Sequence, residues 1–383
     1  MINPIGDGED HMDMLRRLDL QPRPLWRAAL TTLGAAGLVA VGSRGGRWLD
    51  PALLGYLLAT LFACFGIAYR YWDWVDRPPT WMYFRHSLKT LFSRKGFKAF
   101  FQMGVAAGDQ IVLQRFIEKR SLRRWGAHFL LSWGCLLAFS ITIPLVFGWV
   151  RFTSAGLDAT RYQAWLMGVP AFTFPLDSLT ATLTFHALDI TAVMVIAGCV
   201  LSIIRRTQDE GDTATQRADL DLAPLLLLIA VSVTGIMLTV SESYLQGRNF
   251  HTIAYVHELT VILLLLSLPF GKLFHIVQRP AQIGVKLYKA EGEAEGRMPC
   301  KACSTPFIRA NQRRDLEELW DRLDLKGATH ADGKFHHLDL CPRCKRRLVA
   351  RSQSERLHGG FDPFHDLPLP TEPIPDATTW SKS

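Results

Sequence analysis

The chain has 383 residues, of which 49% are hydrophobic, and its mean hydropathy is +0.10. A net charge of +8 would suit a nucleic-acid-binding protein, but the basic residues cluster beside apolar runs rather than on one soluble surface, which fits the edge of a membrane better. Long apolar runs between Arg27 and Ile276, followed by about a hundred mostly polar residues, instead predict a membrane domain and a separate C-terminal part.

Six apolar segments approach the roughly 20 residues that a helix needs to cross a bilayer. Five of them are long: Leu53–Trp72, His128–Val150, His186–Ile204, Leu222–Val240 and Ile253–Ile276. The sixth, Ala28–Gly42, is shorter and rich in alanine and glycine. We therefore expect an all-α membrane protein with a five- to six-helix transmembrane bundle.

The loops between these segments alternate in their content of lysine and arginine. Twelve such residues occur from Arg70 to Arg124, whereas the loop after the second long segment carries Arg151 and Arg161. We therefore expect a protein of the bacterial inner membrane. The positive-inside rule predicts that the first of these loops and the C-terminal part face the cytoplasm. Aromatic and basic residues alternate within the insert 76–124, which predicts amphipathic helices at the lipid surface, with docking of a partner subunit as the alternative.

Four histidines lie at or within the predicted spans, where an ionisable side chain is a functional candidate by default. His257 and His275 are eighteen residues apart. On one continuous helix this is five turns, so both would point from the same face about 27 Å apart. His128 begins its span at the depth of His275, and His186 at the depth of His257. Because imidazole binds haem iron, the pattern predicts one bis-histidine b-type haem near each membrane surface, with His251 as a weaker alternative partner of His257.

The segment from His257 to His275 reads HELTVILLLLSLPFGKLFH and is followed by IVQRP. It resembles the last transmembrane helix of the gamma subunit of respiratory nitrate reductase, a five-helix dihaem cytochrome b with relatives in heterodisulfide-reductase-like complexes. The likeness covers about Leu53 to Lys289 and includes FGIAYRY from Phe65 and TGIMLT from Thr234.

This resemblance implies that His128 and His275 bind the haem nearer the cytoplasm and that His257 binds the outer haem. The family has a second histidine ten residues after the first on its second helix, where this chain has Ala138. Either His186 replaces that ligand, so that two haems are bound, or the outer haem is absent and one remains.

The seven cysteines fall into two groups. Cys64, Cys135 and Cys199 lie singly in apolar segments and are expected to be small buried hydrophobic residues. The others form two C-x-x-C pairs, Cys300 with Cys303 and Cys341 with Cys344. Two such pairs predict a tetrahedral zinc site, as in zinc ribbons, with a single iron as in rubredoxin as the chemical alternative. The segment Arg313–Leu325 between the pairs has the apolar spacing of a helix.

These observations divide the chain into four parts. Residues 1–50 form an N-terminal segment that includes the sixth apolar run, and residues 51–289 form the five-helix haem-binding domain with the insert 76–124. Residues 290–352 form a small zinc-ribbon-like cytoplasmic module, and residues 353–383 form a proline-containing tail that is expected to be disordered.

The predicted function is that of a membrane cytochrome b subunit in a respiratory oxidoreductase complex. It would move electrons between the quinone pool and a soluble iron–sulfur or other redox subunit. Asp189, Glu242 and Glu258 lie at the depth of the outer haem and are candidates for proton exchange with quinone. The alternatives are a zinc-regulated membrane transporter, whose histidines would form a cation path, and a structural anchor without haem.

Overall fold

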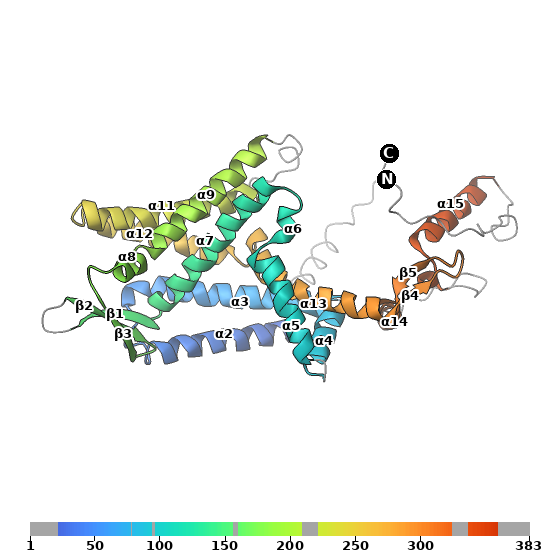
Figure 1. The fold of residues 1–383 in the computed structure, drawn as a ribbon, viewed down its shortest axis with the longest axis horizontal. Coiled ribbons are helices and arrows are strands. Elements are labelled where there is room, and N and C mark those ends of the chain that lie inside the picture. Colours follow the sequence, from blue (N-terminus) through green and yellow to red (C-terminus); the bar gives the residue numbers. More distant parts are fainter. Residues whose placement is uncertain are drawn as a thin grey trace, which may run out of the picture. The chain divides into compact units, whose positions relative to one another are not determined.

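The structure is a computed structural model that describes residues 22–77, 79–93, 96–155, 160–208, 221–323 and 336–358. It comprises two compact units (Figure 1). Unit 1 contains the residues up to Asp76 and Val105–Ala281, and unit 2 contains Arg77–Gly104 and the residues from Gln282 onward. The predicted insert 76–124 is therefore shared between the units. The predictions for residues 1–21 and for the tail after His358 lie outside the described residues.

In the described part of unit 1, six helices are long and apolar enough to cross a membrane. These are α2 (Pro22–Gly42), α3 (Leu54–Asp76), α7 (Leu122–Val146), α9 (Ala187–Gln208), α11 (Ala223–Tyr244) and α12 (Phe250–Ser267). Many of their leucines and valines face outward, as in Leu33, which is 69% exposed. Such a surface suits lipid rather than water. The predicted all-α, multi-pass bundle is confirmed, and the short sixth segment is a full helix.

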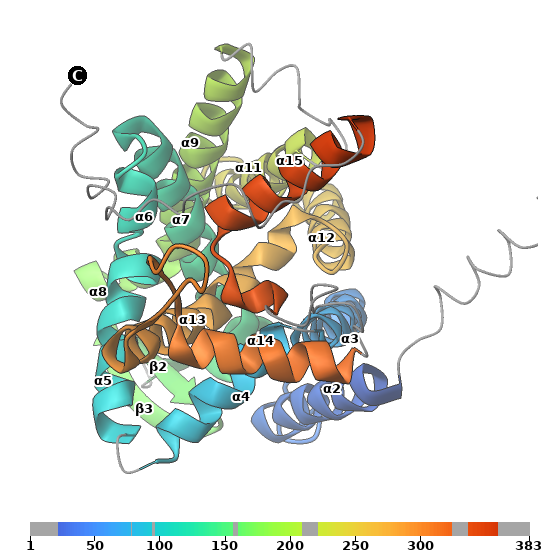
Figure 2. The same ribbon diagram turned by 90° about the vertical axis from the view of Figure 1, so that its right-hand side faces the viewer.

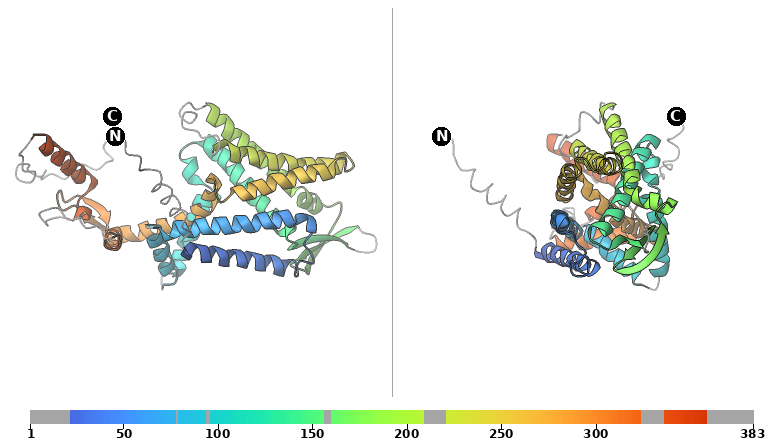
Figure 3. Two further views of the ribbon diagram at one scale, coloured as in Figure 1. Left: turned by 180° about the vertical axis from the view of Figure 1, so that it is seen from behind. Right: turned by 90° about the vertical axis from the view of Figure 1, so that its left-hand side faces the viewer.

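Neighbouring helices of unit 1 pack through small residues and one ion pair. A Cβ atom on Gly198 would lie 2.6 Å from the backbone nitrogen of Leu131, so glycine is what allows α9 to approach α7 this closely. Helices α2 and α3 run side by side (Figure 3), and Arg27 of α2 contacts Asp76 of α3 at 2.9 Å. Helices α11 and α12 likewise lie next to each other (Figure 2).

An antiparallel three-stranded sheet, which was not predicted from the sequence, follows α7. Its strands are β1 (Val150–Ala155), β2 (Arg161–Leu166) and β3 (Val169–Pro175), in that order, and the short helix α8 (Leu179–Phe185) follows. Met167 and Gly168 make the two-residue turn between β2 and β3, both with positive φ, as such hairpins require. We call the end of unit 1 that carries this sheet the sheet end, and the opposite end, where α7 begins, the His128 end.

The last predicted span is not one helix. Helix α12 ends at Ser267, a 3₁₀ turn covers Lys272–Phe274, and α13 (His275–Glu295) begins anew. Pro269 cannot donate the backbone hydrogen bond that a continuing helix requires. Arg70 stabilises the break, because its Nη1 donates to the carbonyl oxygen of Pro269 at 2.6 Å. The prediction that His257 and His275 share one face of a continuous helix is therefore wrong.

The remaining elements of unit 1 lie near the start of α7 or of α3. They are the 3₁₀ turn η1 (Pro51–Leu53), the π-helical turn η2 (Gly108–Val112) and α6 (Arg115–Glu118). Helix α5 (Gly96–Ala107) spans the boundary between the units. It carries exposed phenylalanines, among them Phe97 at 87% and Phe100 at 70%, which is consistent with the predicted position at a lipid surface.

Unit 2 contains α4 (Thr80–Leu91), the second half of α13, the hairpin β4 (Arg297–Pro299) with β5 (Pro306–Arg309), α14 (Ala310–Arg322), the turn η5 (His337–Asp339) and α15 (Pro342–His358). Tyr288 of α13 lies at its centre and is 3% exposed. Its hydroxyl donates to Asp315 of α14 at 2.5 Å, and the ring of His86 from α4 packs edge-on against it. The helix predicted over Arg313–Leu325 corresponds to α14.

Candidate functional site

Two of the four predicted haem ligands meet at the His128 end of unit 1. His128 lies two turns into α7, His275 is the first residue of α13, and their ring centroids are 6.4 Å apart. An imidazole nitrogen binds a metal at about 2 Å, so two rings on opposite sides of one metal ion have centroids about 6 to 6.5 Å apart. The spacing of this pair therefore fits two axial ligands of one iron.

Each of these rings has its Nδ1 atom engaged by a protein oxygen. His128 Nδ1 donates to Gln114 Oε1 at 2.8 Å, and His275 Nδ1 donates to the carbonyl oxygen of Lys272 at 2.6 Å. A neutral imidazole that donates through Nδ1 keeps its lone pair on Nε2, the atom that then binds a metal. The Lys272 carbonyl is available because the helix is interrupted between α12 and α13. The Lys272 side chain is in turn held by Asp221, which also contacts Arg206 at 3.2 Å.

The same pattern recurs at the sheet end. His257, two turns into α12, donates from Nδ1 to Thr234 Oγ1 at 2.9 Å, while the Thr234 hydroxyl donates to the carbonyl oxygen of Ala230 at 2.8 Å. A Cβ atom on Gly235 would be 3.4 Å from His257 Cε1, so the ring lies directly against α11.

His186 caps the C-terminus of α8 and pairs through Nδ1 with Asp189 Oδ2 at 2.9 Å. The other oxygen of Asp189 accepts a hydrogen bond from Thr239 of α11 at 2.9 Å. Both His186 and His257 are thus linked to α11, His257 directly through Thr234 near its middle and His186 through Asp189 and Thr239 nearer its end. Within the described residues, however, no ring contact joins them, so their pairing stays a prediction. His251 is exposed and packs on Phe250, with ring centroids 6.1 Å apart.

The three carboxylates predicted to exchange protons with quinone differ in their surroundings. Asp189 orients His186 and Thr239 as described above. Glu258 is half-buried and adjoins the start of α3, since its Oε1 would be 2.6 Å from a Cβ atom on Gly55. Glu242 is exposed near the end of α11. Asp189 and Glu258 are both partly buried and lie next to a candidate haem ligand, but both oxygens of Asp189 are engaged by His186 and Thr239. Glu258 is therefore the stronger candidate for proton exchange.

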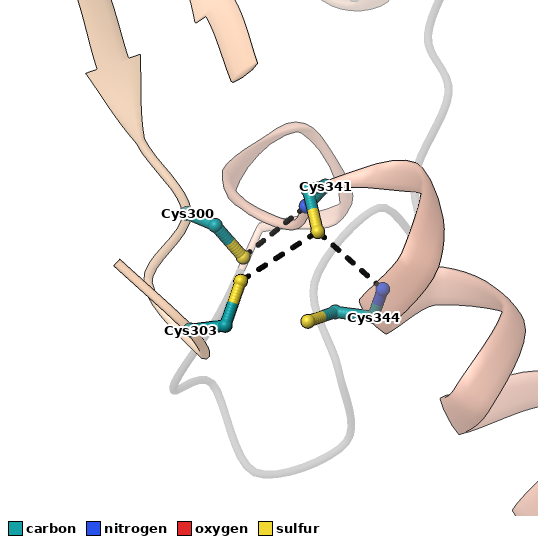
Figure 4. Close-up of side chains that lie close together, drawn as sticks. All are labelled: Cys300, Cys303, Cys341 and Cys344. Atoms are coloured by element: carbon teal, nitrogen blue, oxygen red, sulfur yellow. Dashed lines mark hydrogen bonds between the residues drawn. The ribbon is translucent and has the colours of Figure 1, made fainter. Parts of the chain in front are cut away.

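The four cysteines of the C-terminal module converge (Figure 4). Their sulfur atoms all lie within 4.8 Å of one another, and Cys303 Sγ is 3.7 Å from Cys341 Sγ. Zinc–sulfur bonds of about 2.3 Å in a tetrahedron place sulfur atoms about 3.8 Å apart. Backbone N–H groups also point at the sulfurs, with Cys341 N donating to Cys300 Sγ at 3.2 Å. The cluster suits a single zinc or iron ion.

Local structure explains how the sequence brings the cysteines together. Cys300 and Cys303 lie in the tight turn between β4 and β5, where Ser304 adopts a φ of 55°. Cys341 precedes α15 and Cys344 lies in its first turn, where burial, together with hydrogen bonds to the other cysteines, raises the pKa of the Cys344 thiol. Burial opposes ionisation of Cys303, but hydrogen bonds with Thr305 and with neighbouring cysteines outweigh it and lower its pKa to about 6.

The histidines of this module have other partners. His336 Nδ1 accepts a hydrogen bond from the backbone N–H of Leu338, and the ring of His337 stacks on Trp320 with centroids 5.5 Å apart. The three isolated cysteines lie within the spans of unit 1, and Cys199 is fully buried as predicted. Cys64 and Cys135 are partly buried.

The hydrogen-bond acceptors of the histidines, Gln114, Thr234 and the Lys272 carbonyl, were missed in the sequence. Only Thr234 could have been found from the sequence, because it belongs to the TGIMLT segment that carries the family resemblance.

Comparisons of the chain with protein-family models, with curated proteins and with solved structures gave no match.

Proposed function

We propose that the chain is a membrane cytochrome b subunit that moves electrons between quinone and a soluble redox partner through haem b. One observation carries this proposal. All four predicted ligands, at both ends of a membrane-spanning bundle, engage Nδ1 with a protein oxygen, so Nε2 is the atom that would bind a metal. A histidine that only fills a polar gap has no need of this uniform orientation.

At the His128 end, His128 and His275 would hold one haem. Bound haem supplies a one-electron carrier whose potential depends on its axial ligands and surroundings. Arg279 lies one turn after His275, is exposed, and has its guanidinium 4.8 Å from the ring centroid of Phe116. Its fork of N–H donors suits a propionate carboxylate of the same haem. At the sheet end, His257 and His186 would hold the second haem.

The quinone site is proposed beside the second haem, where the half-buried Glu258 exchanges a proton with the quinone oxygen and the exposed Glu242 connects to water. The four-cysteine module is proposed to bind zinc and to dock the soluble iron–sulfur or other redox subunit on the cytoplasmic side of a bacterial inner membrane. Iron at the cysteines, as in rubredoxin, is the alternative, and it would make the module an electron relay.

A reduced-minus-oxidised visible spectrum tests the haem assignment. Membranes that contain the overexpressed chain should give a Soret difference and b-type bands that grow with the amount of chain, and a reduced quinol should reduce the haem without dithionite. A purified chain without Soret absorption contradicts the proposal and favours a transporter or a structural anchor.

The haem content of the purified chain tests the assignment of His186. Two haems per chain are expected, and His186→Ala should lower this to about one, because it removes an axial ligand of the second haem. His251→Ala is the matched control, since it also removes an exposed histidine at the sheet end and should leave two. One haem in the unmodified chain, or loss of a haem in the control but not in His186→Ala, would contradict the pairing.

A further inference from the structure

The turn that leads into α6 holds Gln114 in an unusual way. Gln114 has a φ of 53°, a left-handed conformation that non-glycine residues adopt only at a cost, and it is 5% exposed. A strained backbone at a buried polar residue suggests that the surroundings select its side chain.

Helix α7 holds this turn from both sides of His128. The indole N–H of Trp125 donates to the carbonyl oxygen of Leu113 at 2.8 Å, and that of Trp133 donates to the carbonyl oxygen of Val112 at 3.1 Å. These bonds satisfy two carbonyl groups that the irregular backbone leaves without helical partners. The turn is thus attached to α7 one helical turn before His128 and just over one turn after it.

The hydrogen bonds of the Gln114 amide define its orientation. Its Nε2 donates to the hydroxyl of Ser132, which itself donates to the carbonyl oxygen of Phe129 at 3.4 Å. This leaves the Oε1 atom directed at His128 Nδ1, 2.8 Å away. In this arrangement both polar ends of the buried amide are satisfied, and His128 carries its proton on Nδ1.

We propose that Gln114 is a positioning residue that holds His128 in the Nδ1–H tautomer and sets the redox potential of the haem that His128 would bind. The inference rests on the proposed function and adds a determinant of the potential. The acceptor for His275 is the backbone carbonyl of Lys272, which remains whatever side chain is placed at position 272. The acceptor for His128 is the neutral side chain of Gln114, which a substitution can change. A carboxylate at position 114 would draw the Nδ1 proton more strongly, make the imidazole more electron-donating and favour ferric over ferrous iron.

The test compares Gln114→Glu and Gln114→Gly with the same changes at Gln246. Gln246 is exposed in the turn between α11 and α12 and has a φ of 52°, so it reproduces both the chemical change and the left-handed backbone. Glycine tolerates this backbone, so Gln114→Gly removes the acceptor without adding strain. Two quantities are measured for the haem that His128 and His275 would bind: its midpoint potential, by optical redox titration, and its affinity for the chain. The His275→Ala variant, which should lose this haem, identifies its signal.

In Gln114→Glu the midpoint potential of this haem should fall by at least about 59 mV. For one electron, this corresponds to a tenfold rise in the oxidised-to-reduced ratio at a fixed potential. In Gln114→Gly its affinity should fall about tenfold or more, and the Gln246 variants should match the unmodified chain. Potentials and affinities unchanged in both Gln114 variants would overturn the inference while leaving the proposed function intact. An unmodified chain without haem would overturn both.

Discussion

Replacing His275 with alanine is expected to remove about one haem from each chain and leave the protein folded. The substitution deletes one of the two proposed axial ligands, so we expect the haem to dissociate from the remaining His128 imidazole during purification. Alanine is a good helix former at the start of α13. The lost hydrogen bond to the Lys272 carbonyl is worth about 0.5 to 1.5 kcal/mol, which is small for a bundle of this size. Haem per chain, measured on purified protein, is the readout.

The control for this variant is Lys286→Ala, an exposed position later on α13 that lies outside the proposed haem site. It should keep the full haem content. The His128→Ala variant should lose the same haem as His275→Ala, and the double variant should lose no more than either alone. An unchanged haem content in His275→Ala would rule out the assignment of this pair.

The membrane helices could be predicted from the sequence because composition alone marks a segment that must satisfy its backbone inside lipid. The break after Ser267 could not, since leucines continue almost to Pro269 and the averaged hydropathy of the segment stays high. Proline in a membrane helix often causes only a kink. Here the guanidinium of Arg70, almost two hundred residues away in the sequence, occupies the carbonyl groups that the break exposes. Such a distant partner leaves no local signal.

The candidate site divides in a similar way. Matching depth predicted that His128 and His275 lie near each other, because His128 is close to the start of α7 and His275 follows the end of α12, which runs in the opposite direction. The break then changed how His275 is oriented, by offering it the Lys272 carbonyl. Gln114, which accepts the corresponding hydrogen bond from His128, could not be predicted, because a glutamine in a basic interfacial loop is most often solvated. The sheet β1–β3 escaped prediction because its strands are short and occupy what the hydropathy pattern marks as a loop.

The second large effect is expected at the four cysteines. The chain should bind one zinc ion, and Cys341→Ser with Cys344→Ser should abolish binding and unfold the module. The reason is its core: the buried cluster consists of Cys300, Cys341, Cys344 and Leu340, so the ligands themselves make up most of it. Structural zinc in such small folds contributes on the order of 10 kcal/mol. Elemental analysis of purified protein identifies the metal. About one non-haem iron per chain without zinc would contradict the zinc assignment and favour a single iron, as in rubredoxin.

The same double variant tests whether the module docks a partner or supports the haem. All proposed haem ligands lie in unit 1 and all four cysteines lie in unit 2, so the haem spectrum should stay intact while the soluble redox subunit dissociates. The Cys64→Ser and Cys135→Ser variants, which alter single cysteines within spans of unit 1, should keep both zinc and partner. Loss of haem in the double variant would mean that the module forms part of the haem-binding fold. Retention of the partner would assign docking to another surface and leave zinc a purely structural role.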